Sequence, residues 1–209
     1  ALSRSEQFIE KNQKNILIGL AAIVIIVAGT LFFRHSYLAP KEEAAQKMIF
    51  IGEQYFAIDS FKVALQGNGA EYIGFEGIID EYGATKTADL AAAYAGLCYK
   101  NMGNYEKAID YLSKSDADDI MVSPALTGAI GDCYVELGKA DKAVSFFEKA
   151  ADSDNELLAP IYLMKAARVY ESLEKYNKAV KIYERIKKDY PNSQEGLDVE
   201  KYIERAKTK

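Results

Sequence analysis

An internal repeat of 35 to 36 residues constrains the fold of this chain more than any other feature of its sequence. A tyrosine recurs at intervals of 35 and then 36 residues, and an alanine follows each tyrosine by nine residues. A repeated unit of this length holds one helical hairpin, which cannot bury its apolar face alone, so neighbouring hairpins must stack. We therefore expect an all-α fold. The equivalent pairs are Tyr99 with Ala108, Tyr134 with Ala143, and Tyr170 with Ala179.

Each repeat also places a small residue in its first helix and a bulky apolar residue in its second helix. The small residue lets the two helices approach closely, and the bulky residue fills the space that remains between them. This complementarity indicates that the two helices of each unit pack directly against each other. The small residues are Gly96, Gly131 and Ala167, and the bulky residues are Leu112, Phe147 and Tyr183.

The turns between the paired helices are marked by Gly103 and Gly138, whereas the third repeat has Glu174 at the equivalent place. Glycine at the end of a helix favours the left-handed conformation that terminates it. Upstream of the second pair, Ser123 is predicted to cap a helix that carries Pro124 in its first turn, where a missing N–H is tolerated.

Together these residues resemble the tetratricopeptide repeat, a helix-turn-helix unit of about 34 residues. The resemblance implies an α-solenoid with three repeats in residues 88–191. Terminal repeats need a helix with a polar outer face, and residues 192–209 show a short apolar set among many charges. We expect a capping helix there.

A weaker copy of the repeat precedes these three, with Gly52, Tyr55 and Ala64 at the same spacing. The distance from its tyrosine to that of the next repeat is 44 residues, which is about ten too many for the period. Apolar residues at helical spacing between Ala70 and Tyr82 indicate an inserted helix. Residues 34–87 are thus predicted to hold a juxtamembrane helix and a divergent first repeat.

Residues 16–33 contain eighteen consecutive residues without a charge, preceded by a short tail of residues 1–15. This length is close to what a helix needs to cross about 30 Å of hydrocarbon, so we expect a transmembrane helix. Pro40 is expected to end or kink it. A cleaved secretory signal is the main alternative, although its apolar core is shorter and is followed by small residues. A second alternative is a helix buried in the core of a soluble domain.

The membrane orientation is predicted from the size of the flanking parts rather than from charge. Lysines and arginines are nearly balanced on the two sides of residues 16–33, so the positive-inside rule decides little. Long domains after the span translocate largely regardless of charge. We therefore expect a single-pass protein of the bacterial inner membrane, with a cytoplasmic N-terminus and a periplasmic repeat domain.

Composition argues against several classes of function. The net charge of −5 disfavours nucleic-acid binding, and the single histidine, His35, beside the apolar segment disfavours metal ligation and hydrolase chemistry. No cluster suggests a cofactor, and we expect no enzyme. Cys98 and Cys133 precede the repeated tyrosines at equivalent points of adjacent repeats, about 8 to 10 Å apart, which is too far for a disulfide, so both are predicted to be buried packing residues. The acidic runs at 116–119 and 152–154 are predicted to be solvated loops, with a loosely bound cation as the alternative.

Stacks of this kind usually bind partners on the concave face, which the first helices form. A Lys and Asn pair that grips a C-terminal carboxylate in some relatives is absent at the matching positions. An apolar and aromatic groove edged by two cations suits extended or helical polypeptide with modest sequence demands. Helical register assigns to this face Phe50, Ala93, Tyr94, Leu97, Asp132, Met164, Lys165 and Arg168.

The run from Tyr94 to Leu112, with the short tail and single span, resembles the YfgM-type tetratricopeptide proteins, which are ancillary subunits of the SecYEG translocon. The resemblance implies a chaperone-like module that works near the channel exit, with translocon subunits, emerging polypeptides or periplasmic chaperones as partners and membrane lipid around the anchor. A scaffold in another envelope assembly, for outer-membrane protein insertion, secretion or motility, is the alternative.

Overall fold

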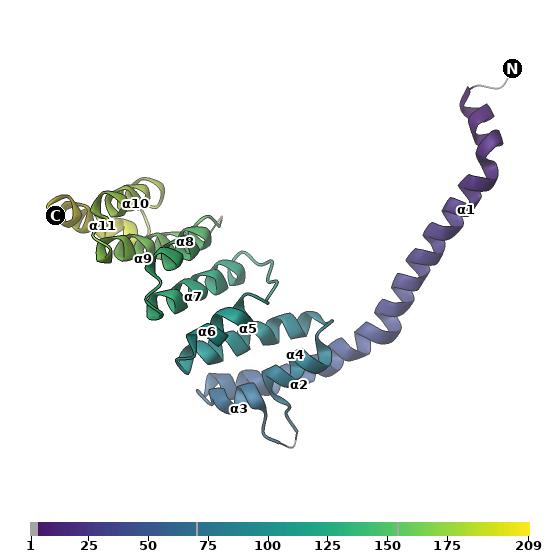
Figure 1. The fold of residues 1–209 in the computed structure, drawn as a ribbon, viewed down its shortest axis with the longest axis horizontal. Coiled ribbons are helices and arrows are strands. Elements are labelled where there is room, and N and C mark those ends of the chain that lie inside the picture. Colours follow the sequence, from purple (N-terminus) through teal and green to yellow (C-terminus); the bar gives the residue numbers. More distant parts are fainter. Residues whose placement is uncertain (1–3, 70, 154) are drawn as a thin grey trace.

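The computed structural model describes residues 4–69, 71–153 and 155–209, and within these residues the regular elements are all helical (Figure 1). Residues 1–3 of the predicted tail, Ala70 of the predicted inserted helix and Asp154 of an acidic run lie outside the described residues. The elements are α1 (Arg4–Phe33), η1 (Arg34–Leu38), α2 (Ala39–Ala57), α3 (Phe61–Gln66), α4 (Gly74–Tyr82), α5 (Lys86–Asn101), α6 (Tyr105–Leu112), α7 (Val122–Glu136), α8 (Ala140–Ala151), α9 (Leu158–Ser172), α10 (Tyr176–Asp189) and α11 (Gln194–Lys207).

The helices from α5 to α10 form three hairpins that stack in sequence order, and α11 covers the last one. The first helices α5, α7, α9 and α11 also contact one another in succession. A methyl group added at Gly96 would lie 2.6 Å from Cγ of Leu112, and one added at Gly131 would lie 2.6 Å from a ring carbon of Phe147. Small residues therefore permit the close approach of paired helices, and the predicted all-α solenoid is confirmed.

The hairpin turns have the backbone that the sequence predicts. Gly103 has a φ of +76° and Gly138 a φ of +68°, both in the left-handed region, and Glu174 adopts the same conformation with a φ of +58°.

The predicted cap at Ser123 is wrong. α7 begins one residue earlier, and the Asp119 carboxylate accepts hydrogen bonds from the backbone N–H groups of Met121 and Val122 at 2.8 and 2.9 Å. An acidic side chain in the preceding loop thus satisfies backbone donors at the start of the helix, in place of the serine.

The divergent first hairpin consists of α2 and α3, with α4 packed between them and α5. The Tyr72 hydroxyl donates to the Ala64 carbonyl at 2.7 Å, and its oxygen is the nearest atom to a methyl group placed on Gly52. The Glu76 carboxylate then accepts from the hydroxyls of Tyr99 at 2.6 Å and Tyr111 at 2.9 Å. These contacts fix the inserted helix to the next hairpin.

The first helix extends away from the stack (Figure 1). It does not end at Pro40. The π-helical element η1 lies directly before this proline, where the hydrogen-bond ladder loses a donor, and the helix continues into α2. Residues 11–57 form one helix that is long and apolar enough to cross a membrane, with a mean hydropathy of 2.9 over its most apolar window and none of that window buried.

Candidate functional site

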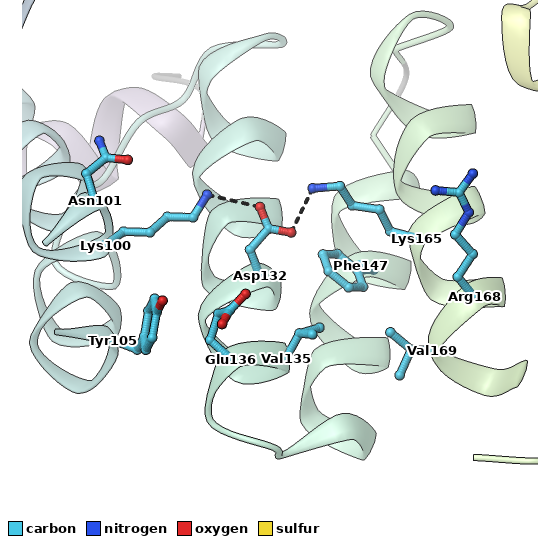
Figure 2. A pocket seen from close by; sticks show the side chains of 10 residues that line it. All are labelled: Lys100, Asn101, Tyr105, Asp132, Val135, Glu136, Phe147, Lys165, Arg168 and Val169. Atoms are coloured by element: carbon cyan, nitrogen blue, oxygen red, sulfur yellow. Dashed lines mark hydrogen bonds and ion pairs between the residues drawn. The ribbon is translucent and has the colours of Figure 1, made fainter. Parts of the chain in front are cut away.

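The first helices α5, α7 and α9, with one residue each from α6 and α8, form an open pocket with a volume of about 480 Å³ (Figure 2). Its floor and walls combine cations, carboxylates and apolar side chains from three consecutive repeats. The lining residues are Lys100, Asn101, Tyr105, Asp132, Val135, Glu136, Phe147, Lys165, Arg168 and Val169.

Asp132 lies at the centre of this pocket and is shared by two lysines. Lys100 Nζ lies 3.1 Å from one carboxylate oxygen and Lys165 Nζ lies 2.7 Å from the other (Figure 2). The three side chains are partly exposed, so each pair stabilises the stack only weakly, by about 0 to 1 kcal/mol. The bridge does, however, fix the position of two cations at the pocket surface.

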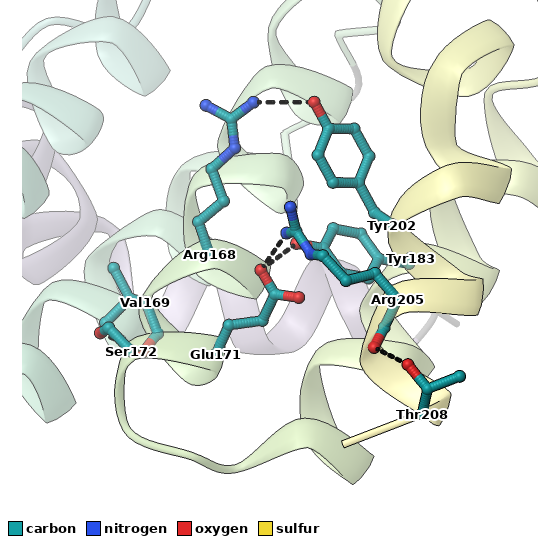
Figure 3. Close-up of polar contacts among 8 residues, drawn as sticks. All are labelled: Arg168, Val169, Glu171, Ser172, Tyr183, Tyr202, Arg205 and Thr208. Carbon is teal, nitrogen blue, oxygen red and sulfur yellow. Dashed lines mark hydrogen bonds and ion pairs between the residues drawn. The ribbon is translucent and has the colours of Figure 1, made fainter.

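A second pocket of about 260 Å³ continues from the first, because both include Lys165 and Arg168. It extends over α11, where Arg168 lies 5.6 Å from the centre of the Tyr202 ring and donates to its hydroxyl at 3.4 Å (Figure 3). We call the two pockets together the groove. It runs across α5, α7, α9 and α11.

A partly buried carboxylate joins the last repeat to the capping helix. Glu171 Oε2 accepts from Arg205 at 2.6 Å and from the Tyr183 hydroxyl at 3.2 Å (Figure 3). Burial, together with this carboxylate, raises the pKa of Tyr183 above its ordinary value. Tyr183 therefore stays neutral as a hydrogen-bond donor.

The two pockets of the groove differ in charge. The second pocket places the carboxylates of Glu195 and Asp198 beside Lys165 and Arg168, whereas the first has Lys100, Lys165 and Arg168 facing Asp132 and Glu136, one more cation than carboxylate. Aromatic rings support the cations: Lys165 lies 5.5 Å from the centre of the Phe147 ring. Such a surface can bind polypeptide segments that combine apolar and acidic side chains.

The structure brings some of the predicted concave-face residues together. Asp132, Lys165 and Arg168 line the first pocket, and Met164, although only 6% exposed, lines the second.

The other predicted residues lie elsewhere. Ala93 is buried with Leu112 in a core cluster, and Leu97 packs against that cluster while half-buried. Tyr94 stacks on the ring of Phe75 at 5.2 Å between centroids. Phe50 is 60% exposed on α2 and does not line the groove. The groove thus lies over the three repeats of α5 to α10 and the capping helix.

Sequence reasoning missed the half of the first pocket nearest the C-terminal ends of α5 and α7. Lys100 lies three residues after Leu97, and Glu136 lies four residues after Asp132. Extending the same helical face by one turn would have found both. The contribution of Tyr202 from the capping helix had no signal in the repeat pattern.

Both cysteines are buried and free of disulfides. Burial raises the pKa of the Cys98 thiol to about 12 and that of Cys133 to about 11. Both thiols are therefore protonated at neutral pH, which agrees with a packing role.

Comparison with known proteins agrees with this architecture. Two family models described as tetratricopeptide repeat match the chain, one over residues 162–193 and the other over residues 95–116 and 128–157. No curated protein sequence matches it. The crystal structure of MamA protein is similar, with a TM-score of 0.59 and 16% identity over 79% of this chain and 87% of that chain. At this identity the likeness concerns the fold alone. The chain therefore contains tetratricopeptide repeats, a module that binds other proteins, within an all-α solenoid.

Proposed function

We propose that this chain is a single-pass membrane protein whose groove binds polypeptide segments, and that it serves as an ancillary, chaperone-like subunit of the SecYEG translocation channel. The groove is the observation that carries the proposal. It is open, crosses four first helices and presents fixed cations beside apolar surface. It offers no cluster of strongly perturbed acids or bases that would suggest catalysis.

The chemistry of the groove favours a ligand with modest sequence demands. Apolar side chains of a bound segment would lie against Val135 and Val169, while its acidic side chains would pair with Lys100 or Arg168. Emerging polypeptides expose mixed sequences of this kind before they fold. This match supports a chaperone-like role rather than recognition of a single motif.

The membrane anchor is supported by the helix that carries it. The large apolar side chains of residues 16–33 are exposed, and none of the most apolar window of this helix is buried. Residues after Phe33 continue as a helix into α2, whose Ala45 and Ile49 belong to the core of the stack. A signal peptidase would have to cut within this continuous helix, and a helical segment is a poor substrate for it. The continuity of the helix therefore favours an uncleaved anchor over a cleaved signal. We place the stack in the periplasm.

A reporter fused after Lys209 tests the orientation. Activity of a periplasm-dependent reporter, such as alkaline phosphatase, is expected. A fusion that is active only as a cytoplasmic reporter would overturn the proposed localisation.

Purification of the intact protein in mild detergent tests the partner. SecYEG subunits are expected to accompany the wild-type chain. A variant with Val135→Glu and Arg168→Glu, which changes charge and apolar surface in the groove, is expected to retain SecYEG poorly or to lose the bound polypeptides. The matched control carries Lys149→Glu and Lys181→Glu on the exposed surfaces of α8 and α10, away from the groove residues.

The alternative of a scaffold in another envelope assembly gives a different outcome. Recovery of such an assembly without SecYEG, lost in the groove variant and kept in the control, would replace the translocon assignment. Equal recovery of partners by both variants would overturn the groove as the binding surface.

A further inference from the structure

The first helices of the stack run in the same direction, so that their N-terminal ends form one edge of the molecule. Glu42, near the start of α2, accepts from the backbone N–H of Lys86 at 2.9 Å and from the Thr87 hydroxyl at 2.6 Å, which places the starts of α2 and α5 side by side. The side-chain amide of Asn155 before α9 donates to the carbonyl of Ile120 before α7 at 2.9 Å. We call the first turns of α5, α7, α9 and α11, with the loops before α7 and α9, the N-terminal edge.

This edge carries a row of large apolar side chains that the described residues leave uncovered. Ile120 is 60% exposed, Leu157 is 64% exposed and Leu197 is 77% exposed, and Met121 and Val122 are also exposed. Single exposed apolar residues need no explanation, but a row along one edge indicates a contact surface. On the opposite edge, among the described residues of the last turns of these helices and the turns after them, the exposed large apolar side chains are Ile58, Met102 and Val135.

The N-terminal edge lies on the side from which the anchor leaves. α2 begins at this edge and continues backwards through η1 into α1 without a non-helical residue. Figure 1 shows the loops before α7 and α9 on the side of the stack that faces α1. The junction is held in place, because Glu42 caps α5 and Lys41 Nζ donates to the Glu81 carbonyl at 3.3 Å. When residues 16–33 cross a bilayer, this edge is the part of the repeats that faces it.

Resting on the proposed membrane anchor, we propose that the N-terminal edge docks on the surface of the bilayer that α1 crosses, with Ile120, Met121, Val122 and Leu157 in the lipid interface. Lipid is the occupant that fits, because the same helix that starts this edge enters the membrane. The contact holds the groove in one orientation above the bilayer.

Charge on the same edge determines which lipids it accepts. The loop before α7 carries Asp116, Asp118 and Asp119, so anionic headgroups repel it. The apolar side chains are therefore expected to enter a zwitterionic surface and to withdraw as anionic lipid is added at low salt.

Fluorophore labelling of the full chain in phosphatidylcholine nanodiscs tests the proposal. Ile120→Cys and Leu157→Cys each receive an environment-sensitive dye, and the lipids carry a nitroxide quencher near the top of the acyl chain. Ile58→Cys and Met102→Cys on the opposite edge are the matched controls, and Ile25→Cys reports on the anchor. The native thiols are buried, so that they react slowly.

Blue-shifted and quenched emission at positions 120 and 157, with unshifted and unquenched emission at 58 and 102, is the expected result. Quenching at position 25 without quenching at 120 and 157 would overturn the edge contact and leave the anchor intact. Blue-shifted emission at positions 120 and 157 without quenching by the lipid nitroxide would show that a protein, not lipid, contacts the edge. That result would also overturn the proposal. Equal quenching at all four stack positions would contradict an edge-specific contact. No quenching at position 25 would overturn the anchor, and with it this inference.

Discussion

At the scale of single residues, the three hairpin turns differ in how they accommodate a left-handed backbone. Gly103 and Gly138 adopt it without cost, whereas Glu174, with a φ of +58°, carries a side chain in the same conformation. Left-handed φ values cost a residue other than glycine about 1 kcal/mol.

Replacing Glu174 with glycine is therefore expected to stabilise the protein. We expect Glu174→Gly to raise the free energy of unfolding by roughly 0.5 to 1 kcal/mol, measured by denaturant unfolding of the detergent-solubilised chain. Lys181→Gly, at an exposed position inside α10, is the control and should lower it by about 1 kcal/mol. A loss of stability in Glu174→Gly would show that the side chain contributes more than its backbone strain costs.

The two thiols give a second residue-scale prediction. Because burial raises the pKa of Cys98 to about 12 and of Cys133 to about 11, neither thiol should react with a thiol reagent at pH 8 in the folded chain. Both should react quickly in denaturant. Rapid reaction of the native protein, followed spectroscopically, would show that these residues are accessible.

The roles of individual residues were predicted well where the repeat pattern specifies them. They were predicted poorly where the conformation of a loop determines the contacts. The left-handed turns at Gly103 and Gly138 follow from local backbone preference alone. The cap of α7 does not, because the loop geometry selects Asp119 over Ser123. Ala93 was assigned to the concave face but is buried, in a core cluster that joins it to Leu112 of α6 and Leu126 of α7.

At the scale of elements, α4 is the part of the stack that the repeat pattern does not specify. It lies between the divergent first hairpin and α5, and Glu76 fixes it by accepting from two tyrosine hydroxyls. The sequence predicted an extra helix there from its spacing and apolar period. It did not predict the Glu76 contacts, because they join residues 23 and 35 positions apart across different repeats.

Removal of this carboxylate should loosen α4. We expect Glu76→Ala to destabilise the protein by about 1 to 3 kcal/mol, because two partly buried hydroxyls lose their acceptor. Glu76→Gln keeps a carbonyl acceptor and should cost less, while Glu71→Ala, at an exposed position, should be near neutral. Hydrogen exchange should localise the loss of protection to α4. Unchanged protection there in Glu76→Ala would contradict the role of these hydrogen bonds.

At the scale of the whole molecule, buried thiols and phenols make the free energy of unfolding fall at alkaline pH. Burial raises the pKa of Cys98 from 9.0 to about 12, and burial with the Glu76 hydrogen bond raises that of Tyr99 from 10.0 to about 12. In this range the unfolded chain releases protons that the folded chain retains, so stability is present below pH 9 and falls as the pH rises towards 12.

The melting temperature should accordingly be flat from pH 7 to 8.5 and fall progressively from pH 9 to 11. Thermal denaturation followed by circular dichroism measures this, and Cys98→Ala with Cys133→Ala should make the decline between pH 9 and 10 shallower. A melting temperature independent of pH over this interval would contradict the burial of these groups.

At this scale the proposed function depends on one surface, the groove across α5, α7, α9 and α11, in a chain that we propose is tethered to a bilayer by α1. Photo-crosslinking from that surface in living cells tests it most directly. A crosslinking amino acid at Val135 or Arg168 is expected to give adducts with polypeptide, and one at Lys149 or Lys181 on the second helices is expected to give none. Adducts from the second-helix positions, with none from the groove, would contradict the account.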